Sequence, residues 1–189
     1  LGYDTLARII SDAVPSKGWP MAAALLAVVV AVVTTTSDGT RVVQGEAHEA
    51  FRADADSLVL TPDERALIER LATTTEPDAK LVVNPYQGGS LAYAIADRAV
   101  THYYMNTQAS PDAEYVTQHL RNVIADPHVC EAVSATGARY ALVLEGSEMN
   151  GPTKTGLTHP GLRGLATAEG FTRVDAEGES VLYGISACD

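Results

Sequence analysis

The chain has 189 residues and a formal net charge of −11, with 46% hydrophobic residues, 20% charged residues and only two cysteines. This composition excludes a disordered tail and fits one globular domain with an additional segment. All of the net charge belongs to residues 37–189, because residues 1–36 carry two acidic and two basic side chains. An acidic surface without a Lys/Arg cluster repels phosphate backbones, so we expect no nucleic-acid partner.

An apolar segment near the start of the chain predicts a transmembrane helix. Residues 19–33 carry no charge, and three threonines extend the uncharged run to 18 positions. At about 1.5 Å per residue this run covers roughly 27 Å, close to the ~30 Å hydrocarbon core of a bilayer. Basic residues precede the run and acidic residues follow it, so the positive-inside rule puts residues 1–18 on the cytoplasmic side and the remainder outside.

Two other interpretations of residues 19–36 stay open. The run is rich in valine and threonine, and β-branched residues favour strands, so it also fits a buried strand of the core. It also fits the apolar region of an export signal, although no small-x-small cleavage site follows it. The chain begins at Leu1 rather than Met, which indicates a piece of a longer protein.

Cys130 and Cys188 predict one disulfide, because an even pair of cysteines in an exported domain is usually bonded. In a reducing cytosol the two cysteines would instead be small core residues. No C-x-x-C motif or His/Cys spacing resembles a zinc site, so we expect no metal. Closing a loop of about 58 residues would stabilise the fold by roughly 4 kcal/mol. It would also hold the C-terminus, which otherwise tends to fray.

Residues 37–56 are polar and predict a linker, and residues 57–189 predict the folded extracytoplasmic domain. Thr61, Pro62 and Glu64 form a helix start, so a helix is expected from Pro62 to about Ala72. The elements expected after it are a strand at 79–83, a helix at 90–96, a strand at 99–104, a helix from 110, a helix from 126 to 137, a strand at 140–144, a helix at 162–168, and a hairpin of strands at 171–175 and 181–185. This alternation predicts an α/β three-layer domain with a central, mostly parallel sheet and an antiparallel edge hairpin.

The loop at residues 84–90 is the strongest candidate for ligand binding. It follows a strand and precedes a helix, and open α/β sheets bind ligands at the carboxyl ends of their strands. Glycines allow close backbone approach, free N–H groups at a helix start favour anions, and neutral polar side chains fit a sugar or polar head group. An ordinary turn capped by Ser90 is the alternative. The candidate ligand-binding residues are Asn84, Tyr86, Gln87, Gly88, Gly89 and Ser90.

A second candidate is the long loop at residues 145–161, which fits a lid, a docking surface or a disordered excursion. No catalytic motif is present elsewhere, so no catalytic residue and no cofactor are predicted. The five histidines (His48, His102, His119, His128 and His159) are scattered along the sequence and are interpreted as structural. Residues 46–49 carry two glutamates and a histidine, a combination too common to predict a metal site.

Several motifs resemble a known family. They are LTPDERAL at 60–67, NPYQGGSLAYA at 84–94, DPHVC at 126–130, RYALVL at 139–144, and a terminal hairpin that ends in SAC at 186–188. Together with the preceding apolar segment they resemble the C-terminal end of an uncharacterised family of large actinobacterial multipass membrane proteins. The hydropathy of that family is similar to that of polyprenyl-phosphate-sugar-dependent glycosyltransferases of the GT-C type. This resemblance implies that residues 1–18 belong to a segment between two spans, instead of the cytoplasmic position given by the charge rule.

The resemblance implies a role in cell-envelope biogenesis. In GT-C-type enzymes the catalytic acid lies in an early extracytoplasmic loop, which this chain does not contain, so no catalytic residue carries over. We therefore expect a domain outside the cell membrane, anchored by residues 19–36, that binds a glycan or lipid-linked sugar for a membrane enzyme such as a glycosyltransferase. The alternative is a structural or protein-interaction domain of the envelope without a small-molecule ligand.

Overall fold

The computed structural model divides the chain into two compact units, Leu1–His48 and Glu49–Asp189. The division falls inside the linker predicted at residues 37–56. The residues that the structure describes are 23, 26–30, 45, 54–57, 59–105, 109–145, 148 and 159–188.

In the N-terminal unit, Ala23 and residues 26–30 are α-helical. The side chains of Leu26, Val28, Val29 and Val30 are exposed, at 46–60% of their full area. These residues take no part in the sheet, which disagrees with the interpretation of a buried strand. Among the residues described, no helix has the length and apolar character needed to cross a membrane. The rest of the span predicted at 19–36 lies outside the described residues.

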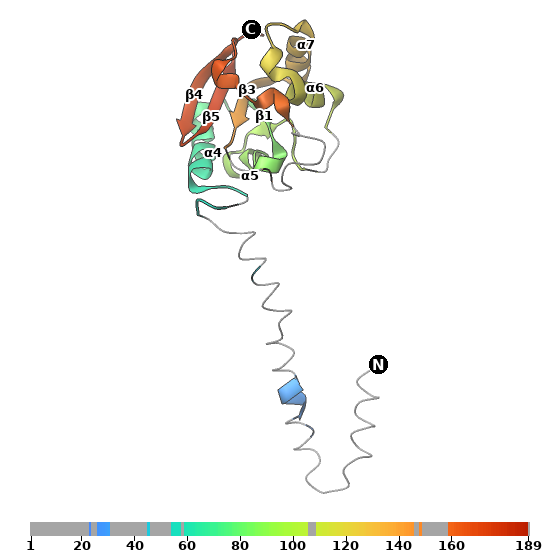
Figure 1. The fold of residues 1–189 in the computed structure, drawn as a ribbon, viewed down its shortest axis with the longest axis vertical. Coiled ribbons are helices and arrows are strands. Elements are labelled where there is room, and N and C mark those ends of the chain that lie inside the picture. Colours follow the sequence, from blue (N-terminus) through green and yellow to red (C-terminus); the bar gives the residue numbers. More distant parts are fainter. Residues whose placement is uncertain are drawn as a thin grey trace. The chain divides into compact units, whose positions relative to one another are not determined.

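The folded unit contains one five-stranded sheet in the order β2-β1-β3-β5-β4 (Figure 1). Its strands are β1 (Lys80–Val83), β2 (Ala99–Val100), β3 (Ala138–Val143), β4 (Phe171–Glu177) and β5 (Ser180–Ile185). Its helices are α4 (Pro62–Thr74), α5 (Leu91–Ala96), α6 (Pro111–His119) and α7 (Pro127–Thr136), with 3₁₀ turns η1 (Pro85–Gln87), η2 (Leu120–Asn122), η3 (Pro160–Leu162) and η4 (Leu165–Thr167).

Helices cover both faces of the sheet, so the three-layer α/β arrangement is confirmed. Side chains alternate across a strand, and β1 accordingly contributes to two apolar clusters. Leu81 and Val83 pack with Leu67 and Leu71 of α4 and with the alanines of α5. On the opposite face, Val82 packs with apolar residues of α6, η2, α7 and η3.

The sheet is mixed, which corrects the prediction of a mostly parallel one. β1 pairs in parallel with β2 and β3, whereas β5 is antiparallel to both β3 and β4. The predicted C-terminal hairpin is present, but only β4 lies at the edge. Leu182 and Tyr183 of β5 are buried, while Arg173 and Val174 of β4 are exposed, so the more apolar strand takes the interior position.

Two predicted elements are shorter than expected. The strand predicted at 99–104 ends at Val100, because Val83 N–H donates to the Thr101 hydroxyl at 3.3 Å instead of continuing the backbone ladder. The helix predicted at 162–168 is replaced by η3 and η4. Gly164, with a φ of +68°, follows an extended Arg163 and separates these two turns.

The helix ends follow the sequence signals closely. The Thr61 hydroxyl accepts the Glu64 N–H, and the Glu64 carboxylate accepts the Thr61 N–H at 2.7 Å, which completes a capping box at α4. Asp126 caps α7, and Gly137 ends it with a φ of +70°. Each such cap satisfies backbone groups that a helix end leaves unpaired.

Cys130 of α7 and Cys188 after β5 form the predicted disulfide. The bond ties the end of the last strand to a helix 58 residues earlier in the chain. It lies beside the apolar cluster beneath α6 and α7, so it fixes the C-terminal segment to the core.

Arg98 is buried and joins the two helices on the α4 and α5 face. Its guanidinium donates to the Thr75 hydroxyl and to the carbonyls of Ala72, Thr75, Ala96 and Asp97 at 2.8–3.2 Å. A buried charge is tolerated only when its hydrogen bonds are made. Arg98 thus satisfies carbonyls at the C-terminal ends of both helices.

Candidate functional site

The carboxyl ends of β1, β2 and β3 meet at one edge of the sheet, because these three strands are parallel. Asn84 follows β1, Thr101 and His102 follow β2, and Glu145 follows β3. The chain leaves β1 toward α5 on one face and leaves β2 toward α6 on the other. Diverging loops of this kind form the crevice in which open α/β sheets bind ligands.

Asn84 organises the loop of the predicted site. Its Oδ1 accepts the Tyr86 N–H at 3.0 Å, and its Nδ2 donates to Gln87 Oε1 at 3.1 Å and to Glu148 Oε1 at 2.9 Å. The side chain is 6% exposed. Asn84 therefore holds the loop in shape and links it to Glu148, and its amide protons are used inside the protein.

Tyr86 and Ser90 connect the loop after β1 to the segment after β2. The Tyr86 hydroxyl donates to the Met105 carbonyl at 3.0 Å, and the Ser90 hydroxyl donates to the His102 carbonyl at 2.7 Å. Ser90 makes no side-chain hydrogen bond to the start of α5, so its predicted capping role is wrong. Its hydroxyl instead satisfies a carbonyl where β2 has ended.

Gly88 and Gly89 are required by the packing of the protein itself. A Cβ on Gly88 would lie 2.3 Å from the Val59 carbonyl oxygen, and one on Gly89 would lie 2.8 Å from Val83 Cβ. Gly88 also has a φ of +78°, which L side chains rarely adopt. The space that these glycines leave is occupied by protein atoms rather than open to a ligand.

Two buried histidines lie beside this loop. They are far apart in the sequence, so the sequence alone did not indicate that they are neighbours. The rings of His102 and His159 are 5.2 Å apart and nearly perpendicular, and the Tyr86 ring is 6.0 Å from that of His159. His102 Nδ1 is 3.2 Å from the Thr101 hydroxyl, and its Nε2 faces Glu114 Oε1 at 3.5 Å. Within the described part of the chain, His102 Nε2 is buried without a hydrogen-bond partner.

Burial keeps both histidines uncharged near neutral pH. Loss of solvation lowers the pKa of His102, although Glu114 opposes the shift. Burial, with a smaller contribution from His102, lowers the pKa of His159 to about 4. The two rings therefore act as neutral polar groups at pH 7.

A second histidine group lies at the junction of α6 and α7. The Tyr115 ring contacts the rings of His119 and His128, with centroids 4.4 and 4.5 Å away. The Tyr115 hydroxyl donates to Asp126 Oδ2 at 2.6 Å, which lowers the pKa of Asp126. No sequence signal indicated either histidine group, because each is assembled from separate elements.

The hydrogen-bonding pattern determines which ligand chemistry fits. The donors of Asn84, Tyr86 and Ser90 are already used, whereas the two hydroxyl oxygens can still accept hydrogen bonds. Glu114, with a half-exposed side chain, adds a carboxylate acceptor. Among the residues described, no three metal-binding side chains are close enough to hold a metal ion. The described side chains at this edge of the sheet therefore offer hydrogen-bond acceptors.

Only part of the second predicted site is described. In the loop at 145–161, Glu148 contacts Asn84, and His159 directly precedes η3, which packs against α6. Glu145 forms a carboxyl pair with Glu179, which raises the pKa of Glu145. Residues 146, 147 and 149–158 lie outside the described residues, as do Glu46, His48 and Glu49.

Fold and site together define a disulfide-bonded α/β domain with a mixed sheet and a neutral polar cluster at the carboxyl ends of its parallel strands. The chain belongs to a family of unknown function, DUF6541, whose match covers residues 1–187. Membership of an uncharacterised family is thereby confirmed. No curated protein is similar enough to the chain to count as a match.

Proposed function

We propose that this chain is an extracytoplasmic part of a cell-envelope membrane protein and that its folded domain binds an uncharged glycan, free or as the sugar of a lipid-linked carrier. The observation that carries the proposal is the group of hydrogen-bond acceptors at the carboxyl edge of β1 and β2, made by two hydroxyl oxygens and the nearby Glu114 carboxylate. Sugar hydroxyls are donors that match the Tyr86 and Ser90 oxygens and the Glu114 carboxylate. A phosphate group, by contrast, would find the side-chain donors of Asn84, Tyr86 and Ser90 already used inside the protein.

Two further features support the location. Disulfides persist in oxidising compartments, which fits the Cys130–Cys188 bond. Helical residues 26–30 expose a series of large apolar side chains, which fits an anchor in lipid. The actinobacterial origin and the partnership with a GT-C-type glycosyltransferase belong to the same proposal and rest on the motif resemblance.

Binding is favoured over catalysis by the state of the hydroxyl groups. The Thr101 hydroxyl, which contacts His102, is buried and accepts the Val83 N–H. The Ser90 hydroxyl donates to a backbone carbonyl. Neither group is placed as an accessible nucleophile beside a histidine, as nucleophilic catalysis requires.

The test is a titration of the full chain, reconstituted in nanodiscs, with uncharged cell-wall oligosaccharides and separately with inorganic phosphate. NMR shifts of the Gln87 and Ser90 amides are the readout. Oligosaccharide is expected to shift both amides and phosphate neither, and a Glu114→Gln variant is expected to bind more weakly. Glu131→Gln, at an exposed position of α7, is the matched control. An unchanged spectrum with every oligosaccharide would refute glycan binding.

The alternative, an envelope protein docking on the loop at 145–161, gives a different result in the same preparation. Deleting residues 150–157 would then abolish capture of that protein without altering any glycan response. Unchanged capture after the deletion would remove the docking alternative.

A further inference from the structure

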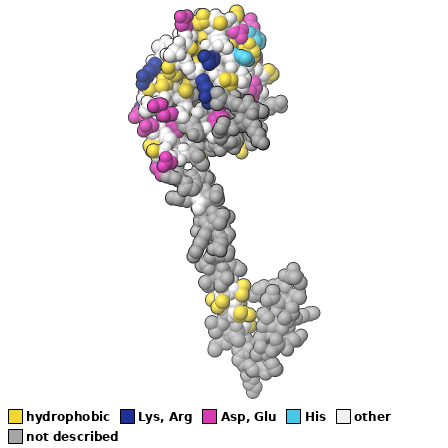
Figure 2. Space-filling model, viewed as in Figure 1, with side chains coloured by type: hydrophobic (Ala, Val, Ile, Leu, Met, Phe, Trp, Pro, Cys, Tyr) yellow, Lys and Arg dark blue, Asp and Glu magenta, His cyan; other side chains and the backbone are white. Residues whose placement is uncertain are grey.

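The most distinctive surface of the domain carries no charged side chain. Residues 84–96 and 99–111 contain no Asp, Glu, Lys or Arg, although residues 37–189 contain 22 acidic and 11 basic residues. The two stretches lie side by side, since β1 pairs with β2 and the Tyr86 and Ser90 hydroxyls reach carbonyls of the second stretch. Elsewhere on the described part of the domain, charged side chains are exposed, and Figure 2 shows both acidic and basic ones on the visible face.

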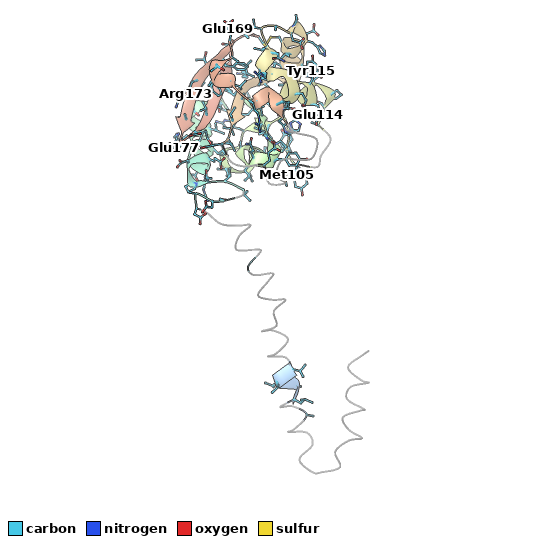
Figure 3. The ribbon with its side chains drawn as sticks, viewed as in Figure 1. Met105, Glu114, Tyr115, Glu169, Arg173 and Glu177 are labelled. Carbon is cyan, nitrogen blue, oxygen red and sulfur yellow. A yellow bond between two sulfur atoms is a disulfide. The ribbon has the colours of Figure 1, made fainter. Side chains whose placement is uncertain are left out.

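Four of the exposed side chains in these stretches are large and apolar or aromatic. We call Tyr93, Ile95, Tyr103 and Tyr104 the tyrosine face; their exposed fractions are 55%, 38%, 52% and 58%. The Tyr93 and Tyr103 rings pack edge to face with centroids 5.1 Å apart. Met105, labelled in Figure 3, follows directly, and its carbonyl accepts the Tyr86 hydroxyl. Isolated exposed apolar residues are common, but Tyr93 and Tyr103 pack together from two separate segments, and such a group marks an interaction surface.

The chain enters the folded domain at the same edge. The backbone of Val59 and the side chain of Leu60 lie against Gly88, in the loop that precedes α5. This entry point leads back, through the polar stretch at residues 37–56, to the apolar segment at 19–36. A tether attached at this point keeps the adjacent surface close to the structure in which the other end of the tether is anchored. The effective concentration of the surface there is therefore high.

We propose that the tyrosine face contacts the lipid headgroup region of the membrane in which residues 19–36 are anchored, an inference that rests on the anchor in the proposed function. Tyrosine favours the membrane interface because its ring is apolar and its hydroxyl is polar. The acidic remainder of the domain would be repelled by anionic lipid, so the uncharged face is the side that approaches.

The acidic groups bordering the face define the preferred lipid. Asp97 ends α5, and Glu114 and Glu148 lie on the side of the histidine pair. These carboxylates disfavour an anionic surface, so the contact is with zwitterionic headgroups. A lipid-linked sugar displayed at that surface would then lie next to the polar cluster of the candidate site.

The experiment places the full chain in nanodiscs of phosphatidylcholine doped with a lipid that carries gadolinium on its headgroup. Methyl NMR measures the broadening of the Ile95 and Met105 signals against that of Ile124, which is 60% exposed but belongs to the segment between α6 and α7. The Ile95 and Met105 signals are expected to broaden several-fold more than the Ile124 signal. A Tyr93→Ser, Tyr103→Ser variant should lose most of this difference, whereas Val174→Ser, at the exposed edge strand, should retain it.

A separate measurement tests the anchor. Vesicles that contain the chain are extracted at alkaline pH, and an anchored chain stays in the vesicle pellet. Retention with equal broadening of Ile95 and Ile124 overturns the membrane contact and leaves the anchor standing. Loss of the chain from the pellet overturns both the anchor and the contact. Greater broadening with phosphatidylglycerol than with phosphatidylcholine contradicts the charge argument. If lipid causes no broadening and the tyrosine variant loses the amide shifts caused by oligosaccharide, the face binds glycan instead.

Discussion

The buried pair of His102 and His159 predicts a specific loss of stability in acid. A histidine in the unfolded chain has a pKa near 6.5, whereas folding lowers the pKa of His159 to about 4. Between these values the unfolded state binds more protons than the folded state. The free energy of unfolding is therefore undiminished above about pH 6.5 and falls as the pH drops toward 4.

The magnitude follows from the size of the shift. At 1.36 kcal/mol per pKa unit, His159 alone removes about 3 kcal/mol by pH 4. Burial lowers the pKa of His102 as well, so it acts in the same direction. This loss is a large part of the 5–15 kcal/mol that typically separates folded from unfolded domains.

The measurement is urea unfolding of the full chain in mild detergent at several pH values, followed by the near-ultraviolet circular dichroism of the tyrosines. His159→Gln is expected to flatten the pH dependence between 6.5 and 4 relative to the unmodified chain. His128→Gln is the control. Glu131 raises the pKa of exposed His128, so this histidine stabilises the folded state at pH values below that pKa, which is the opposite of the effect of the buried histidines. Identical slopes for the unmodified chain and His159→Gln would refute the argument from burial.

Three other substitutions test the packing described above. Gly88→Ala is expected to lower the free energy of unfolding by about 2 kcal/mol or more, because the added Cβ meets the Val59 carbonyl. Gly137→Ala is the control: its φ is also positive but its surroundings are open, so thermal unfolding should show a loss of only about 1 kcal/mol. Arg98→Met leaves helix-end carbonyls unsatisfied and is expected to lower the free energy of unfolding by about 3 kcal/mol or more. Arg98→Lys should recover part of this loss, and equal melting temperatures for the two variants would contradict the role of the guanidinium group. Cys130→Ser combined with Cys188→Ser is expected to lower the free energy of unfolding by about 4 kcal/mol and to increase hydrogen exchange after β5, and unchanged exchange there would be inconsistent with a stapled terminus.

Local sequence signals predicted the elements well wherever a short-range interaction determines the structure. The capping box of Thr61 and Glu64 places the start of α4, and Gly137 ends α7, because each signal acts within a few residues. Signals of the same kind failed where a distant group replaced the expected partner. The Thr101 side chain ends β2 by accepting a strand N–H, and Ser90 bonds the His102 carbonyl instead of capping α5.

The place of the candidate loop in the fold was predicted from the sequence, but its surroundings were not. Its position after a strand is readable from the turn residues that follow Val83, and the structure confirms that this loop lies at the carboxyl edge of the parallel strands. Its chemistry depends on His102, Glu114 and His159, which come from three separate segments. No local pattern connects residues so far apart, since only the packed sheet and α6 bring them together.

By itself, the sequence determined the α/β class, the acidic and uncharged stretches, and the cysteine pair, because composition and local periodicity are properties of the chain before it folds. Tertiary structure alone decided that β5 lies inside the sheet and that two neutral histidines share a buried corner. It also placed the tyrosines of two uncharged stretches on one face. These outcomes depend on which apolar surfaces of different elements pack together, and the sequence within one element does not specify that pairing.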